Sequence, residues 1–390
     1  MRIAGIIAEY NPFHNGHAYH ARMTREMSGC DCVVAVMSGA FTQRGEPALV
    51  DKWARAEMAL CAGVDVVIEL PALFAMRPAD HFALGGVSIL AKMGVDVLSF
   101  GCETDDLPLL DQMSRALEDE SDALSADINA RLAQGMSHAR ARGEALQTAL
   151  NLSPEVVSAP NTVLALEYLT QNRRLKSPLQ PLVIARRGGY HDARMGEMAS
   201  ASAIRAALKS GRDVACAVPK TTREMLEKSP FSHVAALDNL LLNTLRTMRK
   251  AQLAGCPEVA EGLEGRIKRC AEQAIGRSDL MDKVKCKRYT MARISRILNY
   301  ALLGVDERIC AAYPDAPYAR VLGFREAARP ALREMKARAT LPIVTRCAAL
   351  RGEACFELER RATDLWGLTC DSPEMRTGSR DLTERVRIIG

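Results

Sequence analysis

The sequence predicts an α/β protein, with a doubly wound parallel sheet followed by a mainly helical C-terminal region. Over about the first 190 of the 390 residues, short apolar runs alternate with helical patterns, which is typical of parallel strands joined by crossover helices. These runs are almost entirely apolar, as expected for strands whose two faces are both covered. Beyond about residue 230, strand patterns nearly vanish while helical patterns continue.

The expected helices of this half lie between the expected strands. We place strands at residues 3–8, 32–37, 64–69, 95–100 and 182–185, and helices at residues 18–27, 52–62, 79–93, 107–117 and 160–171. Crossovers in such sheets are right-handed, and ligands bind beyond the carboxyl ends of the strands. We therefore expect the segments that begin at Ser38, Leu70, Gly101 and Arg186 to converge on one cleft.

A domain boundary is expected near residues 212–229, where Pro219 and Pro230 border polar sequence. It divides the chain into residues 1–215 and 216–390. In the second part we expect helices at residues 237–253, 259–275, 280–285, 291–303 and 323–338, with residues 341–347 forming either a short strand or the start of a helix.

Charge is distributed unevenly along the chain, although the net charge is only +5. Residues 103–127 are strongly acidic and contain Arg115 as their only Lys or Arg. Residues 283–305 are basic and contain no acidic residue, and residues 320–361 are rich in arginine. The C-terminal half is therefore the better candidate for contact with phosphates.

The 12 cysteines do not indicate disulfides, because they are scattered and form no C-x-x-C pair. Cys30 and Cys32 are separated by one residue, which is weak evidence for a metal site. No apolar run approaches the roughly 20 residues of a membrane span, and we find no secretory signal. We expect a reduced cytoplasmic protein with no membrane partner.

The stretch His14-Asn15-Gly16-His17 is the most informative motif of the chain. It follows the first expected strand and precedes the first expected helix. A helix N-terminus offers unpaired N–H groups and partial positive charge, which suit a phosphate. Gly16 removes a side chain where a nucleotide would lie against the backbone. The motif therefore predicts nucleotide chemistry, with His14 and His17 stabilising charge on a phosphoryl group.

Residues 5–17 resemble the opening of the nucleotidylyltransferase superfamily, whose signature is H-x-G-H. More narrowly, E-Y-N-P-F-H-N-G-H at residues 9–17 resembles the bacterial tRNA(Met) cytidine acetate ligase family. That family uses ATP to activate acetate and acetylates the wobble cytidine of elongator tRNA(Met). The resemblance implies a Rossmann-like, nucleotidylyltransferase-type catalytic domain at residues 1–215 and a tRNA-binding region at residues 216–390.

Further motifs of this chain match the acetate ligase family. They are F-x-Q-R-G-x-P at residues 41–47 and P-N-x-x-L-A-x-E-Y-L at residues 160–169. Asn161 would read the adenine edge or the ribose of ATP, although an asparagine there also suits a helix N-cap. Gly101 matches a position where the backbone passes close to the nucleotide.

Two basic motifs point to the polyphosphate. Arg186 and Arg187 follow the last expected strand of the sheet, and adjacent guanidiniums can clamp phosphate oxygens. Residues 200–205 resemble the second superfamily signature, S-[ST]-[ST]-x-I-R, with Ala replacing one hydroxyl residue. This substitution leaves the alignment of the serines open, and Ser202 and Arg205 are the favoured phosphate ligands.

The resemblance implies catalytic roles for His14 and His17 and an ATP site built around the motif. The expected ATP-binding residues are Ile7, Ala8, Glu9, Tyr10, Asn11, Pro12, Phe13, His14, Asn15, Gly16, His17, Ala18, Tyr19, His20, Gly101, Asn161, Arg186, Arg187, Ser202 and Arg205. Mg²⁺ is expected with the ATP, although no acidic metal motif is evident. The sequence offers no clear nucleophile for an acyl-enzyme.

Residues 288–296 resemble a further run of the acetate ligase family, R-Y-T-x-x-R-I-x-R. The helical pattern predicts that Arg293 and Arg296 face outward from an apolar helix face. The expected RNA-binding residues are Arg288, Tyr289, Arg293 and Arg296, with Tyr289 stacking on a base. Tyr318 and Arg320 are a weaker candidate of the same kind.

Three acidic or basic residues beside the expected cleft can be explained without a role in binding or catalysis. Asp51 suits a helix N-cap, with Lys52 directly after it, and Glu69 at the end of the third strand favours a structural role.

The resemblance predicts a ligase whose partners are acetate and elongator tRNA(Met), and leaves assembly into a homo-oligomer open. Two alternatives remain at this point. One is a small-molecule adenylyltransferase of the same superfamily, and the basic C-terminal half argues against it. The other is a non-catalytic RNA-binding protein, and the intact His14 and His17 argue against that.

Overall fold

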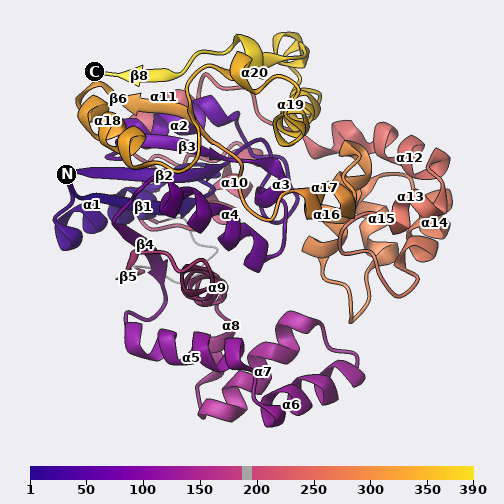
Figure 1. Ribbon diagram of the computed structural model, residues 1–390. Coiled ribbons are helices and arrows are strands. Elements are labelled where there is room, and N and C mark those ends of the chain that lie inside the picture. The colour runs from indigo at the N-terminus through magenta and orange to yellow at the C-terminus, as the bar shows by residue number, and fades with distance from the viewer. Residues whose placement is uncertain (187–195) are drawn as a thin grey trace.

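The computed structural model describes residues 1–186 and 196–390. Its centre is a mixed, mostly parallel sheet in the order β5-β4-β1-β2-β3-β6-β7, with β8 paired to β6 (Figure 1). The five parallel strands of the N-terminal half are β1 Ile3–Ala8, β2 Cys32–Ser38, β3 Val66–Leu70, β4 Val97–Cys102 and β5 Gln180–Ala185. All five overlap the strands expected from the apolar runs.

Helices cover both faces of this sheet because its strands are apolar on both sides. Along β1, Ile3 and Ile7 belong to one buried cluster while Ala4 and Ile6 belong to another, as the alternation of side chains along a strand requires. The first cluster is covered by α4 Ala79–Lys92 and α9 Pro160–Arg174, and the second by α1 Asn15–Ser28 and α2 Lys52–Cys61.

Two groups of helices project from the sheet (Figure 1). The first is inserted between β4 and β5 and contains α5 Leu107–Asp119, α6 Asp122–Ala133, α7 His138–Leu150 and α8 Pro154–Ser158. The second contains α12 Asp238–Thr247, α13 Lys250–Ala254, α14 Leu263–Gln273, α15 Arg277–Val284, α16 Met291–Leu303 and α17 Glu307–Ala312. The acidic stretch therefore lies in the first group, and the basic stretch lies in the second.

The C-terminal part of the chain returns to the sheet, which the sequence did not predict. Residues 323–338, expected as one helix, begin within β6 Ala319–Arg325, and α18 Arg329–Arg338 starts only later. Strand β6 is buried and pairs antiparallel with β3, so tertiary pairing decides the conformation of a run that periodicity leaves ambiguous. The short strands β7 Ile343–Val344 and β8 Arg387–Ile389 pair with β6.

The remaining helices connect these parts. They are α3 Ala72–Ala75, α10 Ala201–Lys209, α11 Lys220–Leu226, α19 Ala354–Gly367 and α20 Arg380–Thr383. The expected helix at residues 237–253 is divided, because α12 ends at Thr247 and α13 begins at Lys250.

A buried cluster of charged side chains joins the N-terminal sheet to the C-terminal segments. Lys52 Nζ lies 2.5 Å from Glu69 Oε1, 2.9 Å from Glu359 Oε1 and 2.7 Å from Asp381 Oδ1. Arg320 contacts Glu69 and Asp381 from the other side. The structural role expected for Glu69 is confirmed, and Asp51 caps α2 through the Ala54 N–H.

Candidate active site

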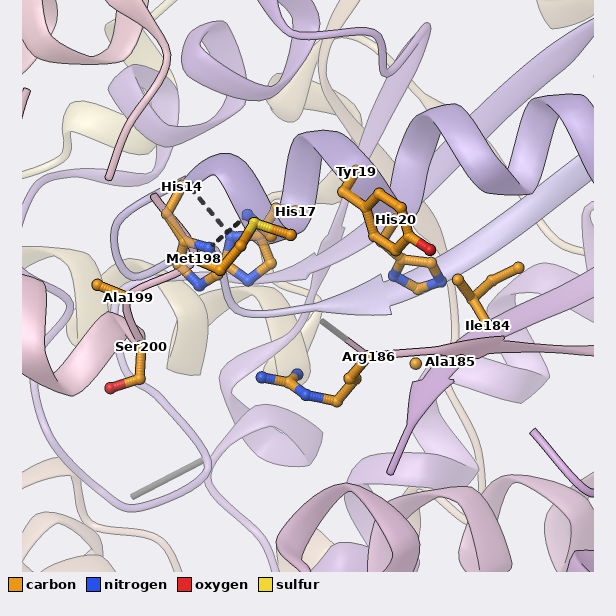
Figure 2. Close-up of a pocket in the computed structure, with 12 residues that line it drawn as sticks. His14, His17, Tyr19, His20, Ile184, Ala185, Arg186, Met198, Ala199 and Ser200 are labelled. Carbon is orange, nitrogen blue, oxygen red and sulfur yellow. Dashed lines mark hydrogen bonds between the residues drawn. The ribbon is translucent and has the colours of Figure 1, made fainter. Parts of the chain in front are cut away.

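The histidine motif folds back on itself at the start of α1. The backbone N–H of Gly16 donates to Nδ1 of His14 at 3.1 Å, and the backbone N–H of His14 donates to Nδ1 of His17 at 3.2 Å. The two rings stack with their centroids 3.7 Å apart, and Figure 2 shows both hydrogen bonds as dashed lines. Since each Nδ1 is an acceptor, the proton of each neutral ring is on Nε2.

Burial keeps the imidazoles of α1 uncharged. Loss of solvent, with the nearby positive charges of Arg186 and Arg205, lowers the pKa of His14 to about 3. Burial likewise lowers the pKa of His17 well below its usual value and that of His20 to about 4. At neutral pH these rings are hydrogen-bond donors rather than cations.

A pocket opens beside the motif. Its walls come from the start of α1, from the ends of β4 and β5, and from the segment before α10 (Figure 2). The lining residues are His14, Gly16, His17, Tyr19, His20, Gly101, Ile184, Ala185, Arg186, Met198, Ala199 and Ser200. The predicted convergence of segments is thus confirmed for those that follow β1, β4 and β5.

The two glycines that line the pocket differ in how much space the surrounding atoms would leave for a side chain. A Cβ on Gly16 would lie 2.9 Å from Cε1 of His14, so the folded-back imidazole needs glycine there. A Cβ on Gly101 would come no closer to a neighbouring atom than 3.5 Å, to Cγ of Arg186, which is an ordinary contact. The close approach of a nucleotide to Gly101 stays a prediction.

Arg186 lies on the rim of the pocket in a polar network. Asn161 Nδ2 donates to Glu103 Oε1 at 2.6 Å, and Arg186 donates to Asn161 Oδ1 at 3.4 Å. The N-cap of α9 is Ala159, so the capping role considered for Asn161 is wrong and its side chain faces this network. Arg187 lies outside the described residues.

The second signature contributes a residue that the sequence reasoning did not select. Ser200 caps α10 by accepting from the Ala203 N–H at 3.3 Å, and it lines the pocket. Ser202 does not line the pocket itself, and its Oγ lies 3.0 Å from the Oγ of Ser200. The signal that could have found Ser200 is its position directly before a helix.

Several residues expected to bind ATP support the motif instead of lining the pocket. Tyr10 and Phe13 are buried and contact the His17 ring, with centroid distances of 4.8 and 5.4 Å. Arg205 donates to the Asn11 carbonyl at 2.7 Å, and Asn15 donates to the carbonyls of Glu197 and Cys216. Seven further residues expected to bind ATP are also absent from the lining of the pocket: Ile7, Ala8, Glu9, Pro12, Ala18, Asn161 and Ser202.

The outward orientation expected for Arg296 is wrong. Its guanidinium is buried, lies 2.6 Å from Glu258 Oε2 and donates to the Gln43 carbonyl at 3.2 Å. Arg293 is half-buried and donates to the Glu258 carbonyl. These partners lie 35 or more residues away in the chain, so helical periodicity alone does not reveal them.

The aromatic candidates for stacking on RNA are also covered. Tyr289 is 7% exposed, and the Arg293 guanidinium lies over its ring at 5.0 Å. Tyr318 and Arg320 are buried as well, which contradicts the prediction that they lie on an RNA surface. Arg288 remains exposed, with its guanidinium 3.2 Å from an exposed Glu261.

Other site types find little support in the described structure. Residues 1–186 and 196–390 contain no group of three or more His, Cys, Asp or Glu positioned to hold a metal ion. All 12 cysteines are free. Among the described helices, none is both long and apolar enough to cross a membrane.

Comparisons with known proteins bear on the whole chain. Residues 1–381 match the HIGH Nucleotidyl Transferase family. The tRNA(Met) cytidine acetate ligase of Thermoanaerobacter sp. (strain X514) is 39% identical, with 94% of this chain and 95% of that protein covered. The enzyme of the same name from Acetivibrio thermocellus is 36% identical over the full length of both. The chain belongs to the tRNA(Met) cytidine acetate ligase family.

Solved structures agree with this assignment. The crystal structure of Thermotoga maritima TmcAL bound with alpha-thio ATP is 33% identical, with a TM-score of 0.90 and full coverage of both chains. The apo form of that protein gives a TM-score of 0.92. The fold class expected from the sequence, and the resemblance first noted at residues 9–17, are confirmed.

Proposed function

We propose that this protein activates acetate with ATP and acetylates N4 of the wobble cytidine of elongator tRNA(Met). The products are N4-acetylcytidine, AMP and pyrophosphate. The observation that carries the proposal is the pair of neutral imidazoles at the start of α1, each with Nδ1 occupied and Nε2–H available, in a chain of this family.

In the first step, a carboxylate oxygen of acetate attacks the α-phosphorus of ATP, and the bond to pyrophosphate breaks. Charge develops on the α-phosphate oxygens, and the Nε2–H groups of His14 and His17 donate to them. Such preorganised donors in a dry site stabilise a transition state without reorganisation. Because the rings are neutral, each keeps Nδ1 as the acceptor of a backbone N–H and Nε2–H as a donor toward the ligand.

The rest of the pocket suits the polyphosphate. Arg186 supplies a guanidinium at the rim, Ser200 supplies a hydroxyl at a helix N-terminus, and Arg187 is assigned to the same task. Mg²⁺ in nucleotide sites is held largely by phosphate oxygens and water. We therefore assign Mg²⁺ to the triphosphate, where it would offset phosphate charge.

In the second step, the cytidine N4 attacks the acetyl carbonyl carbon, and the bond between that carbon and the AMP oxygen breaks. The tRNA is assigned to the basic group of helices, because the acidic stretch at residues 103–127 lies in the other group, inserted between β4 and β5. Arg288 and the half-buried Arg293 are the RNA-binding residues that fit this assignment best. We propose that this reaction takes place in the cytoplasm.

The proposal is tested by incubating total tRNA with the protein, ATP and labelled acetate, followed by mass spectrometry of the tRNA, both as nuclease fragments that identify each tRNA and as nucleosides. We expect label in N4-acetylcytidine of elongator tRNA(Met) alone. ATP–pyrophosphate exchange that requires a phosphorylated metabolite instead of acetate would indicate a small-molecule adenylyltransferase. Absence of AMP release with all three substrates would indicate a non-catalytic RNA-binding protein.

A further inference from the structure

The pocket occupies one side of the carboxyl edge of the sheet. Its walls follow β1, β4 and β5, and no described lining residue follows β2. In the strand order β5-β4-β1-β2, the nucleotide side therefore ends at β1. A second substrate that must reach the same phosphate would approach from the β2 side.

The segment that follows β2 is attached to the basic group of helices. The carbonyl of Gly45 accepts from Arg277 at 3.2 Å, from Ser295 Oγ at 2.7 Å and from Asn299 Nδ2 at 2.6 Å. Gly45 has φ +72°, and a Cβ there would lie 2.7 Å from the backbone nitrogen of Arg296. Residues 41–47 thus hold α16, and with it the proposed RNA surface, against the β2 side of the cleft.

The same segment reaches the end of β1 through Glu9. The Gln43 N–H donates to Glu9 Oε1 at 2.7 Å, and Glu9 is partly exposed. Arg205 lies near enough to act electrostatically on both Glu9 and His14, and it is fixed by its bond to the Asn11 carbonyl. Glu9 is therefore a carboxylate between the histidine motif and the segment that carries α16.

The surroundings of Glu9 suit a proton acceptor. Burial raises the pKa of Glu9, against the Gln43 N–H and the positive charges of Arg205, Arg44 and Arg55. On α9, burial and the charge of Glu9 raise the pKa of Tyr168, which therefore stays a neutral phenol. A carboxylate made more basic in this way removes a proton more readily.

We propose that the Glu9 carboxylate accepts the proton that the acceptor amine loses when it attacks the activated acetyl group. This inference rests on the proposed function. As the N4–carbon bond forms, the carbon–oxygen bond to AMP breaks, and AMP leaves with that electron pair. The proton passes from N4 to an oxygen of Glu9 and then to solvent. The exocyclic amine of cytosine is a weak nucleophile because its lone pair is delocalised, so a base is needed at this step.

The variant Glu9→Gln tests the inference by separating the two steps. An amide oxygen still accepts from the Gln43 N–H, so the loop keeps its anchor. Acetate-dependent ATP–pyrophosphate exchange reports the first step, and single-turnover transfer of labelled acetyl to tRNA(Met) reports the second. We expect transfer to fall about 100-fold more than exchange, in line with the 10²–10⁴ attributed to general bases.

Two further measurements exclude a structural role. Trapping by hydroxylamine, a nucleophile that needs no base, should proceed at a rate that follows exchange and not transfer in Glu9→Gln. In the wild type, transfer should rise with pH as Glu9 loses its proton, and this rise should be missing in the variant. The matched control is Glu46→Gln, an exposed acid on the same loop, in which the transfer-to-exchange ratio should match the wild type.

The outcomes distinguish this inference from the proposed function. If wild-type protein lacks acetate-dependent exchange and tRNA acetylation, the proposed function fails. If both are present and Glu9→Gln reduces exchange and transfer equally, or leaves transfer unchanged, the assignment of Glu9 is wrong.

Discussion

At the scale of single residues, each histidine of the H-x-G-H signature uses its two ring nitrogens for different purposes. His14 is the N-cap of α1 and accepts from the Gly16 N–H, and Nδ1 of His17 accepts from the backbone N–H of His14. This reciprocal capping holds both Nδ1 atoms and leaves both Nε2–H groups for a ligand. The interpretations of the motif as a helix cap and as a phosphate site are therefore compatible, because one nitrogen of each ring serves each purpose.

His17→Ala should reduce acetate-dependent ATP–pyrophosphate exchange by about 10²–10³-fold, the usual cost of losing one preorganised donor to a developing anion. Binding of tRNA should remain nearly intact, because no RNA contact is assigned to α1. Filter binding and exchange assays measure the two effects separately. His233→Ala is the control, since His233 is half exposed, pairs with Asp371 and does not line the pocket. Equal loss of exchange and tRNA binding would contradict the role of His17.

The depressed pKa values also predict how stability depends on pH. The folded protein keeps His14 and His20 neutral down to pKa values of about 3 and about 4, whereas in the unfolded chain they take up protons near the ordinary value of about 6.5. The unfolded state then binds more protons, so these residues reduce the free energy of unfolding as pH falls below about 6.5.

Urea unfolding of wild type and His20→Gln between pH 4.5 and pH 7.5 measures this contribution. We expect a shallower acid loss of stability in the variant, and nitrogen NMR shifts of His14 should stay those of a neutral ring with its proton on Nε2. An identical pH slope in both proteins, together with titration of His14 near pH 6.5, would show that the rings are not buried as described.

At the scale of elements, the unit made of β1 and α1 could be predicted because its signals are local. An apolar run, a turn with Gly16 and a residue that can cap a helix all lie within 17 positions. Strand β6 and the buried orientation of Arg296 could not be predicted, because they depend on residues far away in the sequence. Residues of β6 form a strand because they pair with β3, and Arg296 is buried because it pairs with Glu258. Ser200 is an intermediate case: its position as a helix cap could be predicted from neighbouring residues, but its place in the pocket depends on the tertiary fold.

Residues 288–296, which include the start of α16, show how exposed and buried arginines of one motif should differ when they are mutated. Arg288→Ala and Arg293→Ala should weaken tRNA binding, and Arg288→Ala should lower the slope of log affinity against log salt by about one. Arg296→Ala should instead destabilise the fold by up to about 3 kcal/mol, because it removes the ion-pair partner of the half-buried Glu258 and leaves it only the Tyr300 hydroxyl. Affinity measured across a salt series and thermal unfolding separate these effects. An unchanged affinity in Arg288→Ala and Arg293→Ala would exclude this segment from the RNA footprint.

At the scale of the whole molecule, the buried charges around Lys52 connect α2 and β3 with the returning segments β6, α19 and α20. Three carboxyl groups face two cations there: Glu69, Glu359 and Asp381 meet Lys52 and Arg320. Burial and the neighbouring Glu69 raise the pKa of Glu359 to about 8, while Lys52 and Arg320 hold the pKa of Asp381 below its usual range. With Glu359 protonated at neutral pH, the cluster has no net charge, which suits a site without water.

This arrangement predicts the effect of Glu359→Gln on the stability of the whole fold. A pKa raised from 4.5 to about 8 means that the folded state retains a proton that the unfolded chain releases. The favourable contribution of Glu359 is therefore complete below about pH 4.5 and is lost as pH rises toward 8. Glutamine mimics the protonated acid, so the variant should become progressively more stable than wild type from pH 5.5 to pH 8.5. Lys52→Met removes the one cation of the cluster that contacts all three carboxyl groups and leaves only Arg320, so it should destabilise by about 3–5 kcal/mol. A Glu359→Gln variant that is equally destabilised at every pH in urea unfolding would mean that Glu359 is ionised and pairs with Lys52 as a simple salt bridge.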